Sequence, residues 1–307
     1  MNPAYSVILF TTASGAGYGL LALLGLVGFN HGPVSMFAFG ITAIIIALGL
    51  VTTGLLSSTF HLGHPERAWR ALSHWRSSWL SREGLAAIAT YVPAVFFGAT
   101  WTDVIHAPAF IGPFGLVTGA MCAITVFCTA KIYSTLTTIR AWNNPLTVPV
   151  YLAFALATGA ALLAAIATTF GRYQVFQVIL ACAAVILVAI LKYFYWRSID
   201  AAIRTHTMAA ATGLGAGVRQ WEAPHTSENF IMKEMGFAVA RKHALKLRNT
   251  VFLLLLATFL ALAACQVTPW FSFIAAPAIL VAAVVERWLF FAEAQHVVQL
   301  FYGAEKA

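Results

Sequence analysis

Eight long runs of apolar residues constrain this chain more than any other feature. By residue number they cover about 4–29, 34–59, 83–101, 110–133, 147–170, 174–196, 249–267 and 271–301. A helix needs roughly 20 apolar residues to cross a hydrocarbon core about 30 Å thick. Because unpaired backbone groups cannot face lipid, runs of this length predict helices. The expected fold class is therefore an all-α integral membrane protein, a bundle of about eight transmembrane helices.

Composition supports a membrane protein with no separate soluble part. Hydrophobic residues make up 61% of the chain and charged residues only 9%, whereas about a quarter of a soluble domain is charged. Residues 1–307 are expected to form a single membrane domain. Its two longest connections are 60–82, between the second and third helices, and 197–249, between the sixth and seventh. The start of the chain lacks the positive region of a cleavable signal, so the first helix is expected to be retained.

Basic residues gather on one side of the predicted bundle. With eight spans, the two termini and the 2–3, 4–5 and 6–7 connections share one side, and Arg172 is the single Lys or Arg expected on the other. Short basic loops stay in the cytoplasm, so both termini are predicted to be cytoplasmic. This rule, together with attraction to anionic lipids, accounts for the net charge of +8 without nucleic-acid binding.

The chain shows no residue pattern for a redox centre of its own. Cys122, Cys128, Cys182 and Cys265 fall within the predicted spans, and no pair has the spacing of a zinc site or an iron–sulfur ligand run. They are expected to be packing residues. No two histidines are expected mid-membrane on facing helices, as b-haem ligands would be. We therefore expect no haem, iron–sulfur cluster, metal site or catalytic centre in this chain.

The 2–3 connection concentrates titratable side chains at one membrane boundary. Pro65 is expected to stop the second helix just after His61. Ser81 is expected to cap the third helix, which would put Glu83 in its first turn. A carboxylate and an imidazole at such a boundary can exchange protons with a lipid-soluble quinone. The candidate quinone-site residues are His61, His64, Arg67 and Glu83. The alternative is that these side chains cap helices or reach toward lipid phosphates.

The last apolar run contains a second polar group, Glu286-Arg287. Arg287 lies roughly 15 residues, or about 22 Å, along the span. An arginine at that depth usually pairs inside the bundle or lines a cavity. Arg287 is therefore a further quinone-site candidate, and the alternative is an interfacial Glu286–Arg287 anchor without a ligand.

The 6–7 connection is expected to bind a soluble partner, because loops of this length are usually functional. Its glycines, from Gly213 to Gly217, lack the context of a phosphate loop. The basic stretch from Lys233 to Arg248 predicts an amphipathic surface helix leading into the seventh span. Candidate docking residues in both long connections are Arg70, Arg76, Arg82, Trp221, Lys233 and Arg241.

Several of these residues together resemble a known family. They are His61-Leu62-Gly63, Pro65, Arg67, Ser77, Ser78, Leu80, Ser81 and Glu83, with Arg287, Phe290 and Phe291 in the last helix. The set is similar to the membrane anchor subunit of dimethyl sulfoxide reductase, and weaker similarity extends across all eight helices. The resemblance implies an anchor in a bacterial inner membrane that holds an iron–sulfur subunit and a molybdopterin catalytic subunit. It also implies electron exchange with menaquinone or ubiquinone, with the site histidine and glutamate at His61 and Glu83.

Two departures bear on the direction of electron flow and on the site. His64 stands where a small residue is common in the family. Reductases of the family commonly face the periplasm, whereas the charges here place the long connections in the cytoplasm. Anchors of cytoplasm-facing sulfite-oxidising molybdoenzymes also resemble this chain, including its connection from Trp221 to Arg248. They imply quinone reduction driven by sulfite oxidation.

Three alternatives remain open at this point. The first is quinol oxidation that feeds a terminal reductase of the dimethyl sulfoxide reductase type. The second is a transporter, which the helix count alone suggests, although the central thirds of the spans carry almost no charge. The third is a passive scaffold, with quinone reacting on another protein of the complex.

Overall fold

The computed structural model describes residues 4–31, 37–60, 64–201, 206–215, 217–218, 221–222 and 239–302. Its long helices are α1 (Tyr5–His31), α2 (Phe37–Thr59), α3 (Trp79–Trp101), α4 (Ile111–Ser134), α5 (Thr147–Thr169), α6 (Val175–Asp200), α9 (Val239–Ala264) and α10 (Ser272–Ala292). Short helices are α7 (Met208–Thr212) and 3₁₀ turns over Pro65–His74, Pro108–Phe110, Pro269–Phe271 and Val297–Tyr302. The described ranges contain no strand, and eight of their helices are long and apolar enough to span a membrane. The expected all-helical fold with eight spans is confirmed.

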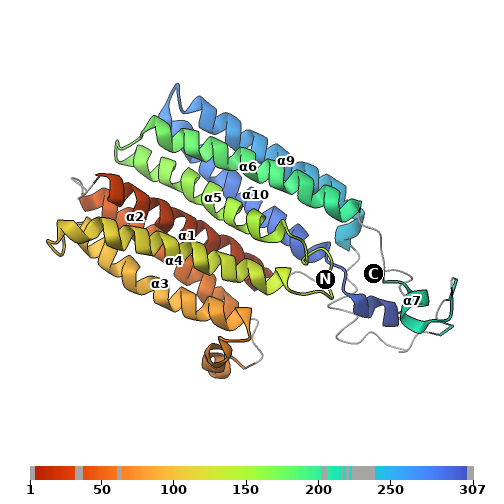
Figure 1. Ribbon diagram of the computed structural model, residues 1–307. Helices are drawn as coiled ribbons and strands as arrows, with labels where there is room; N and C mark the ends of the chain where they lie inside the picture. The colour runs from red at the N-terminus through yellow and green to blue at the C-terminus, as the bar shows by residue number, and fades with distance from the viewer. Residues whose placement is uncertain are drawn as a thin grey trace.

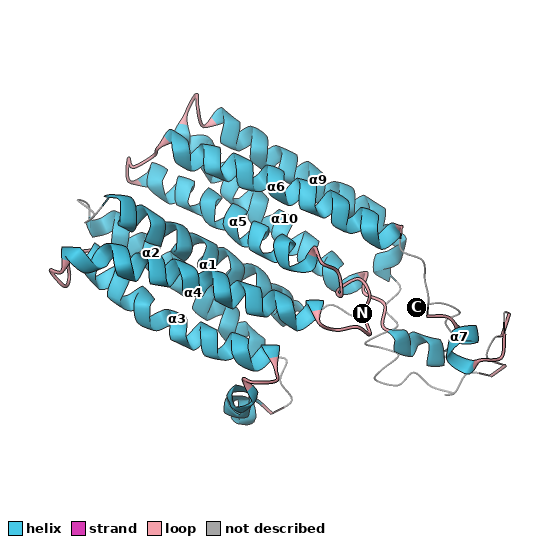
Figure 2. Ribbon diagram, in the orientation of Figure 1, coloured by secondary structure: helices cyan, strands magenta, loops and turns pink. Residues whose placement is uncertain are grey.

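The long helices form two groups of four that lie side by side (Figures 1 and 2). One group is α1 to α4, and the other is α5, α6, α9 and α10. Helices α1 and α5 join the groups and are the most buried spans. In their most apolar stretches, 78% of α1 and 83% of α5 residues are buried, against 33% for α4 and α9. The seam between the groups therefore runs along α1 and α5.

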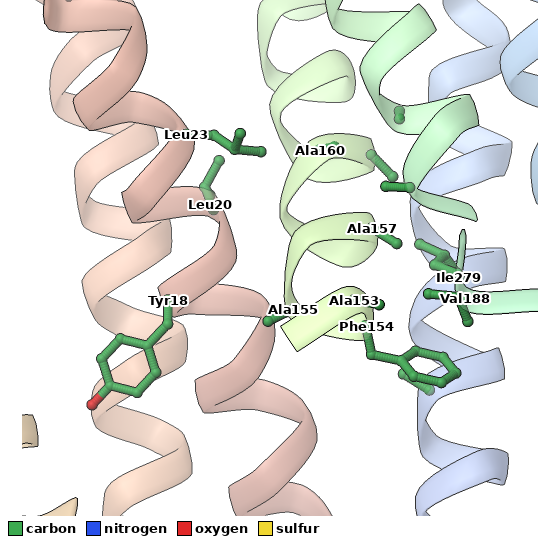
Figure 3. Packing of buried hydrophobic residues seen from close by; sticks show 14 of the residues in the cluster. Tyr18, Leu20, Leu23, Ala153, Phe154, Ala155, Ala157, Ala160, Val188 and Ile279 are labelled. Carbon is green, nitrogen blue, oxygen red and sulfur yellow. The ribbon is translucent and has the colours of Figure 1, made fainter. Parts of the chain in front are cut away.

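Small residues allow α1 and α5 to touch backbone to backbone. A methyl group on Gly19 would overlap the carbonyl of Ala155, and one on Gly159 would overlap the backbone of Gly19. Within lipid, helices associate through such close packing, because the hydrophobic effect does not drive them together. Figure 3 shows Ala155 on the side of α5 that faces α1, with Ala153 and Ala157 on the side toward α6 and α10. Alanine-rich α5 thus packs against α1, α4, α6 and α10.

One end of the bundle carries the 3₁₀ helix Pro65–His74, the connection 135–146 and α7; we call it the A end (Figure 1). The described ends of the chain, at Ala4 and Tyr302, lie at the same end. Among the described residues, Arg172 is the only Lys or Arg in the connections of the opposite end. The structure therefore reproduces the expected charge asymmetry between the two ends.

Helix α3 begins earlier than expected, which changes the roles of two residues. It starts at Trp79, with Ser78 as its N-cap. Ser81 is therefore inside the helix rather than a cap, and its buried hydroxyl has no hydrogen-bond partner among the described residues. Glu83 lies beyond the first turn and is only 5% exposed. The expected boundary is wrong because Ser78 rather than Ser81 is the N-cap residue, so α3 begins before Arg82 and Glu83.

Two other boundaries also differ from the expected ones. Helix α9 begins at Val239 and continues without a break into the span, so residues 239–248 form no separate surface helix. Lys233 lies outside the described residues. The last helix ends at Ala292, and a 3₁₀ turn over Val297–Tyr302 replaces the expected helical continuation.

Candidate functional site

The described part of the 2–3 connection places its candidate residues at the surface. The side chains of His64 and Arg67 are 66% and 57% exposed, and both approach Glu66 Oε1, at 3.0 and 3.7 Å. Exposed pairs of this kind add little stability. His61 lies outside the described residues. The structure therefore does not bring His64 or Arg67 into the buried site described below.

Arg82 holds the 2–3 connection against α3. Its Nε donates to the carbonyl of Trp75 at 2.8 Å, and its Nη2 donates to the carbonyl of Arg76 at 2.7 Å. Its guanidinium also lies 4.3 Å from the centre of the Trp79 ring. These contacts use the Nε and Nη2 donors of Arg82, so this side chain has fewer hydrogen-bond donors left for a partner subunit than we expected of a docking residue.

The remaining docking candidates that the structure describes are exposed. Arg70 and Arg76 lie over Trp69 and Trp75, whose side chains are 66% and 51% exposed. Trp221 in the 6–7 connection is 91% exposed. The side chains of Lys233 and Arg241 lie outside the described residues. The A end thus presents guanidinium and indole groups together.

Glu83 is buried between α3 and α4. The Thr129 hydroxyl donates to Glu83 Oε1 at 2.8 Å. No Lys, Arg or His side chain in the described ranges forms an ion pair with it. A buried carboxyl group with a single neutral partner is a candidate for proton exchange. Glu83 is therefore more than a helix cap.

A buried ion cluster joins α6 to α10. Lys192 Nζ lies 2.8 Å from Glu286 Oε1, and Arg287 Nη2 lies 3.3 Å from Glu286 Oε2. The three side chains are 1%, 0% and 3% exposed for Lys192, Glu286 and Arg287. Lys192 lies inside α6, and Glu286 pairs with it within the bundle. The alternative of an interfacial Glu286–Arg287 anchor is wrong, because both side chains are buried.

Aromatic side chains close the A end over Arg287. The Arg287 guanidinium lies 3.6 Å from the centre of the Tyr151 ring and 5.4 Å from that of Phe290. Trp142, from the 4–5 connection, donates its indole N–H to the Phe290 carbonyl at 2.8 Å. The ring of Tyr133 packs against those of Trp142, Tyr151 and Phe290. These rings separate Arg287 from the surface of the A end.

A narrow cavity, which we call the polar cavity, lies where α1, α4, α5 and α10 meet. Its volume is about 20 Å³, enough for roughly one water molecule. Its polar lining consists of Thr11, Thr12, Ser14, Tyr18, Thr129, Tyr151, Thr158 and Arg287. Thr129 connects this cavity to Glu83, and Arg287 forms part of its wall. Two predicted site residues, Glu83 and Arg287, are thus brought to one polar region.

Sequence reasoning missed Tyr18, Thr129, Tyr151 and Lys192. One of them had a usable signal, because Lys192 lies in an apolar run and could be matched with Glu286 as the opposite charge inside the membrane. The hydroxyl residues had none, since threonines inside helices commonly bond to their own backbone. The cysteines are free and lie in or next to spans, as expected. No group of three or more His, Cys, Asp or Glu among the described residues could hold a metal ion.

Comparison with known proteins identifies the family of this chain. Residues 1–304 match the family described as DMSO reductase anchor subunit (DmsC). The chain belongs to this family. The anchor is also 32% identical to a protein of Allochromatium vinosum that is named as a sulfite dehydrogenase subunit, over 98% of this chain and 99% of that protein. The family resemblance expected from the sequence is therefore confirmed along the whole chain.

Proposed function

We propose that this anchor carries electrons between a partner iron–sulfur subunit and membrane quinone, within a molybdoenzyme complex that oxidises sulfite. Its similarity to a protein named as part of a sulfite dehydrogenase supports the substrate and the direction. One observation carries the quinone assignment: Thr129, which donates a hydrogen bond to the buried carboxyl group of Glu83, and the buried guanidinium of Arg287 both line one polar cavity.

The chain's own residues fit quinone chemistry. A quinone, ubiquinone or menaquinone, takes up two electrons and two protons when it is reduced. Glu83 would deliver a proton, because it is buried and bonded to a neutral hydroxyl. Arg287 would orient a carbonyl oxygen, because a guanidinium only donates hydrogen bonds. His61 keeps its predicted role in proton exchange within this proposal.

The A end is the proposed docking face for the iron–sulfur subunit, which would in turn hold the molybdopterin subunit. Exposed Arg70, Arg76 and Trp221 lie there, and Arg and Trp are enriched in protein interfaces. Positive residues mark the cytoplasmic side. We therefore place this end in the cytoplasm, at the inner membrane of a bacterium.

The proposal is tested by substituting Glu83→Gln in the complete complex. Sulfite-driven quinone reduction is expected to fall by roughly 100-fold, the size of a general acid–base contribution. Sulfite-driven reduction of a soluble redox dye is expected to stay unchanged. Glu66→Gln is the matched control, because Glu66 is also at the A end but 63% exposed. Equal loss of both activities in the Glu83 variant, or of neither, would contradict the proposal.

The direction of electron flow needs its own assay. The purified complex is given sulfite and quinone in one experiment, and quinol with dimethyl sulfoxide in the other. We expect turnover only with sulfite and quinone. Turnover only in the assay with quinol and dimethyl sulfoxide would instead assign the complex to quinol oxidation.

A further inference from the structure

Buried polar atoms without partners gather at the polar cavity. The Tyr18 hydroxyl and the Nε and Nη1 atoms of Arg287 have no hydrogen-bond partner in the described ranges. Both side chains line the cavity, and they are 2% and 3% exposed. Buried polar groups in native proteins are almost always paired. Because a guanidinium has no acceptor atoms, any ligand that pairs with these Arg287 atoms must offer a hydrogen-bond acceptor.

A second, apolar cavity adjoins the polar one. It has a volume of about 130 Å³ and lies between α1, α4 and α5. The two cavities share Tyr18, Val126 and Ala155 as lining residues, so they are adjacent and the Tyr18 side chain lines both. An apolar cavity of about 150 Å³ holds a single six-membered ring. The apolar cavity is therefore close in size to one six-membered ring, and the Tyr18 hydroxyl is its strongest hydrogen-bond donor.

The apolar cavity reaches the lipid-facing surface at the seam between the two helix groups. Ala123 of α4 lines it and is exposed, and Leu152 and Leu156 of α5 line it and are half-buried. Helices α4 and α5 lie next to each other along this seam (Figure 1). A ligand with an apolar tail can therefore enter from the bilayer between α4 and α5 without crossing water.

We infer that a quinone ring binds in the apolar cavity, entering between α4 and α5, with one carbonyl oxygen directed at Tyr18 and Arg287. This rests on the proposed function and adds to it the place of the ring and the entrance. Two electrons from the partner's iron–sulfur clusters and two protons convert both carbonyl groups to hydroxyls. Thr129 lines the polar cavity and bonds to Glu83, so Glu83 would supply a proton through Thr129 and the polar cavity.

The entrance is tested by Ala123→Phe, which fills the mouth of the apolar cavity from the lipid side. Ile124→Phe is the matched control, because Ile124 is the next residue, is 48% exposed and does not line the cavity. In the full complex, Ala123→Phe is expected to raise the KM for a tailed quinone about tenfold, a loss of binding rather than of chemistry. Dye reduction is expected to be unchanged in both variants.

The donor end is tested by Tyr18→Phe, which removes one unpartnered hydroxyl. If Tyr18 had only a structural role, losing an unpaired buried hydroxyl would change neither stability nor quinone kinetics. We expect thermal stability to be retained and the KM for quinone to rise several-fold, about three- to tenfold. Retained stability shows that any kinetic change is not a folding defect.

Photolabelling locates the ring directly. A tailed azidoquinone is expected to label peptides of α4 and α5 that include Ala123 and Leu152, and Ala123→Phe is expected to abolish that labelling. Labelling elsewhere, together with a normal KM for quinone in the Ala123→Phe and Tyr18→Phe variants, would overturn the inference. Loss of quinone turnover in Glu83→Gln would still leave the proposed function standing. Labelling by a photoreactive phospholipid in preference to azidoquinone would make the cavity a lipid site and also overturn it. Absence of quinone turnover in the unmodified complex would overturn both.

Discussion

Glu286 is shared by two buried cations, and this determines which substitutions in the cluster lower stability most. With Lys192 and Arg287 both paired to one carboxylate, the cluster carries one uncompensated positive charge. Lys192→Met removes a cation and leaves Glu286 paired with Arg287. Glu286→Gln leaves two cations buried without an anion. Removing one member of a buried pair costs about 3–5 kcal/mol when it strands a charge, so we expect that cost for Glu286→Gln and a smaller one for Lys192→Met.

Thermal unfolding of the purified complex in nanodiscs measures this ranking. The expected order of Tm is unmodified, then Lys192→Met, then Glu286→Gln. Glu66→Gln serves as an exposed control and should leave Tm unchanged. A Glu286→Gln variant as stable as the unmodified complex would mean that Glu286 does not hold the two cations as described.

His296 makes the stability of the A end depend on pH, and the direction of its pKa shift gives the sign of that dependence. Burial lowers the pKa of His296 below its ordinary value of 6.5, and its Nδ1 accepts a hydrogen bond from the Val298 N–H at 3.0 Å. The unfolded chain therefore binds more protons than the folded one in the pH range below 6.5, so stability rises with pH there and is lost as pH falls. We expect hydrogen exchange at Val297–Tyr302 to speed up as pH falls below 6.5, after correction for intrinsic rates. His296→Asn should remove most of that pH dependence, and an equal dependence in both proteins would show that another group causes it.

The contact between α1 and α5 depends on the absence of side chains at a few positions. Gly19→Ala would drive a methyl group into the Ala155 carbonyl, and overpacking of this kind costs about 1–3 kcal/mol. Gly49→Ala is the control, because a methyl group there meets no atom within 4 Å and alanine favours helices by about 1 kcal/mol. We therefore expect Gly19→Ala to lower Tm and Gly49→Ala to leave it unchanged or raise it. A stable Gly19→Ala variant would show that the two helix groups can separate at low cost.

The helices themselves were predictable because lipid imposes length and apolarity on each span, and those are visible in a single sequence. Helix boundaries were less predictable, since Glu83 lies inside α3, which was expected to begin near it, and Lys192 is a charged residue inside α6. Pairing is what permits their burial, and pairing depends on which helices are neighbours. The polar cavity was not predictable for the same reason. Its walls come from α1, α4, α5 and α10, and no spacing along the chain relates them.

The whole molecule combines two four-helix groups that meet at one seam. Glu83 and Thr129 belong to the first group, and Tyr151 and Arg287 belong to the second. A quinone bound at the seam would meet its proton donor on one group and its orienting guanidinium on the other. Sites between packed units are common places for ligands. A shift between the groups would therefore alter proton delivery and ligand orientation together.

The position of this site predicts whether turnover generates a membrane potential. Glu83 lies toward the A end of α3, and the proposed docking face is at the same end. Electrons and protons would then reach quinone from one side, so no net charge crosses the bilayer. We expect sulfite-driven quinone reduction in sealed proteoliposomes to give no uncoupler-sensitive signal from a potential-sensitive dye, although quinol accumulates. A potential that an uncoupler abolishes would place proton uptake at the opposite end, because charge separation of that kind requires protons and electrons to arrive from different sides.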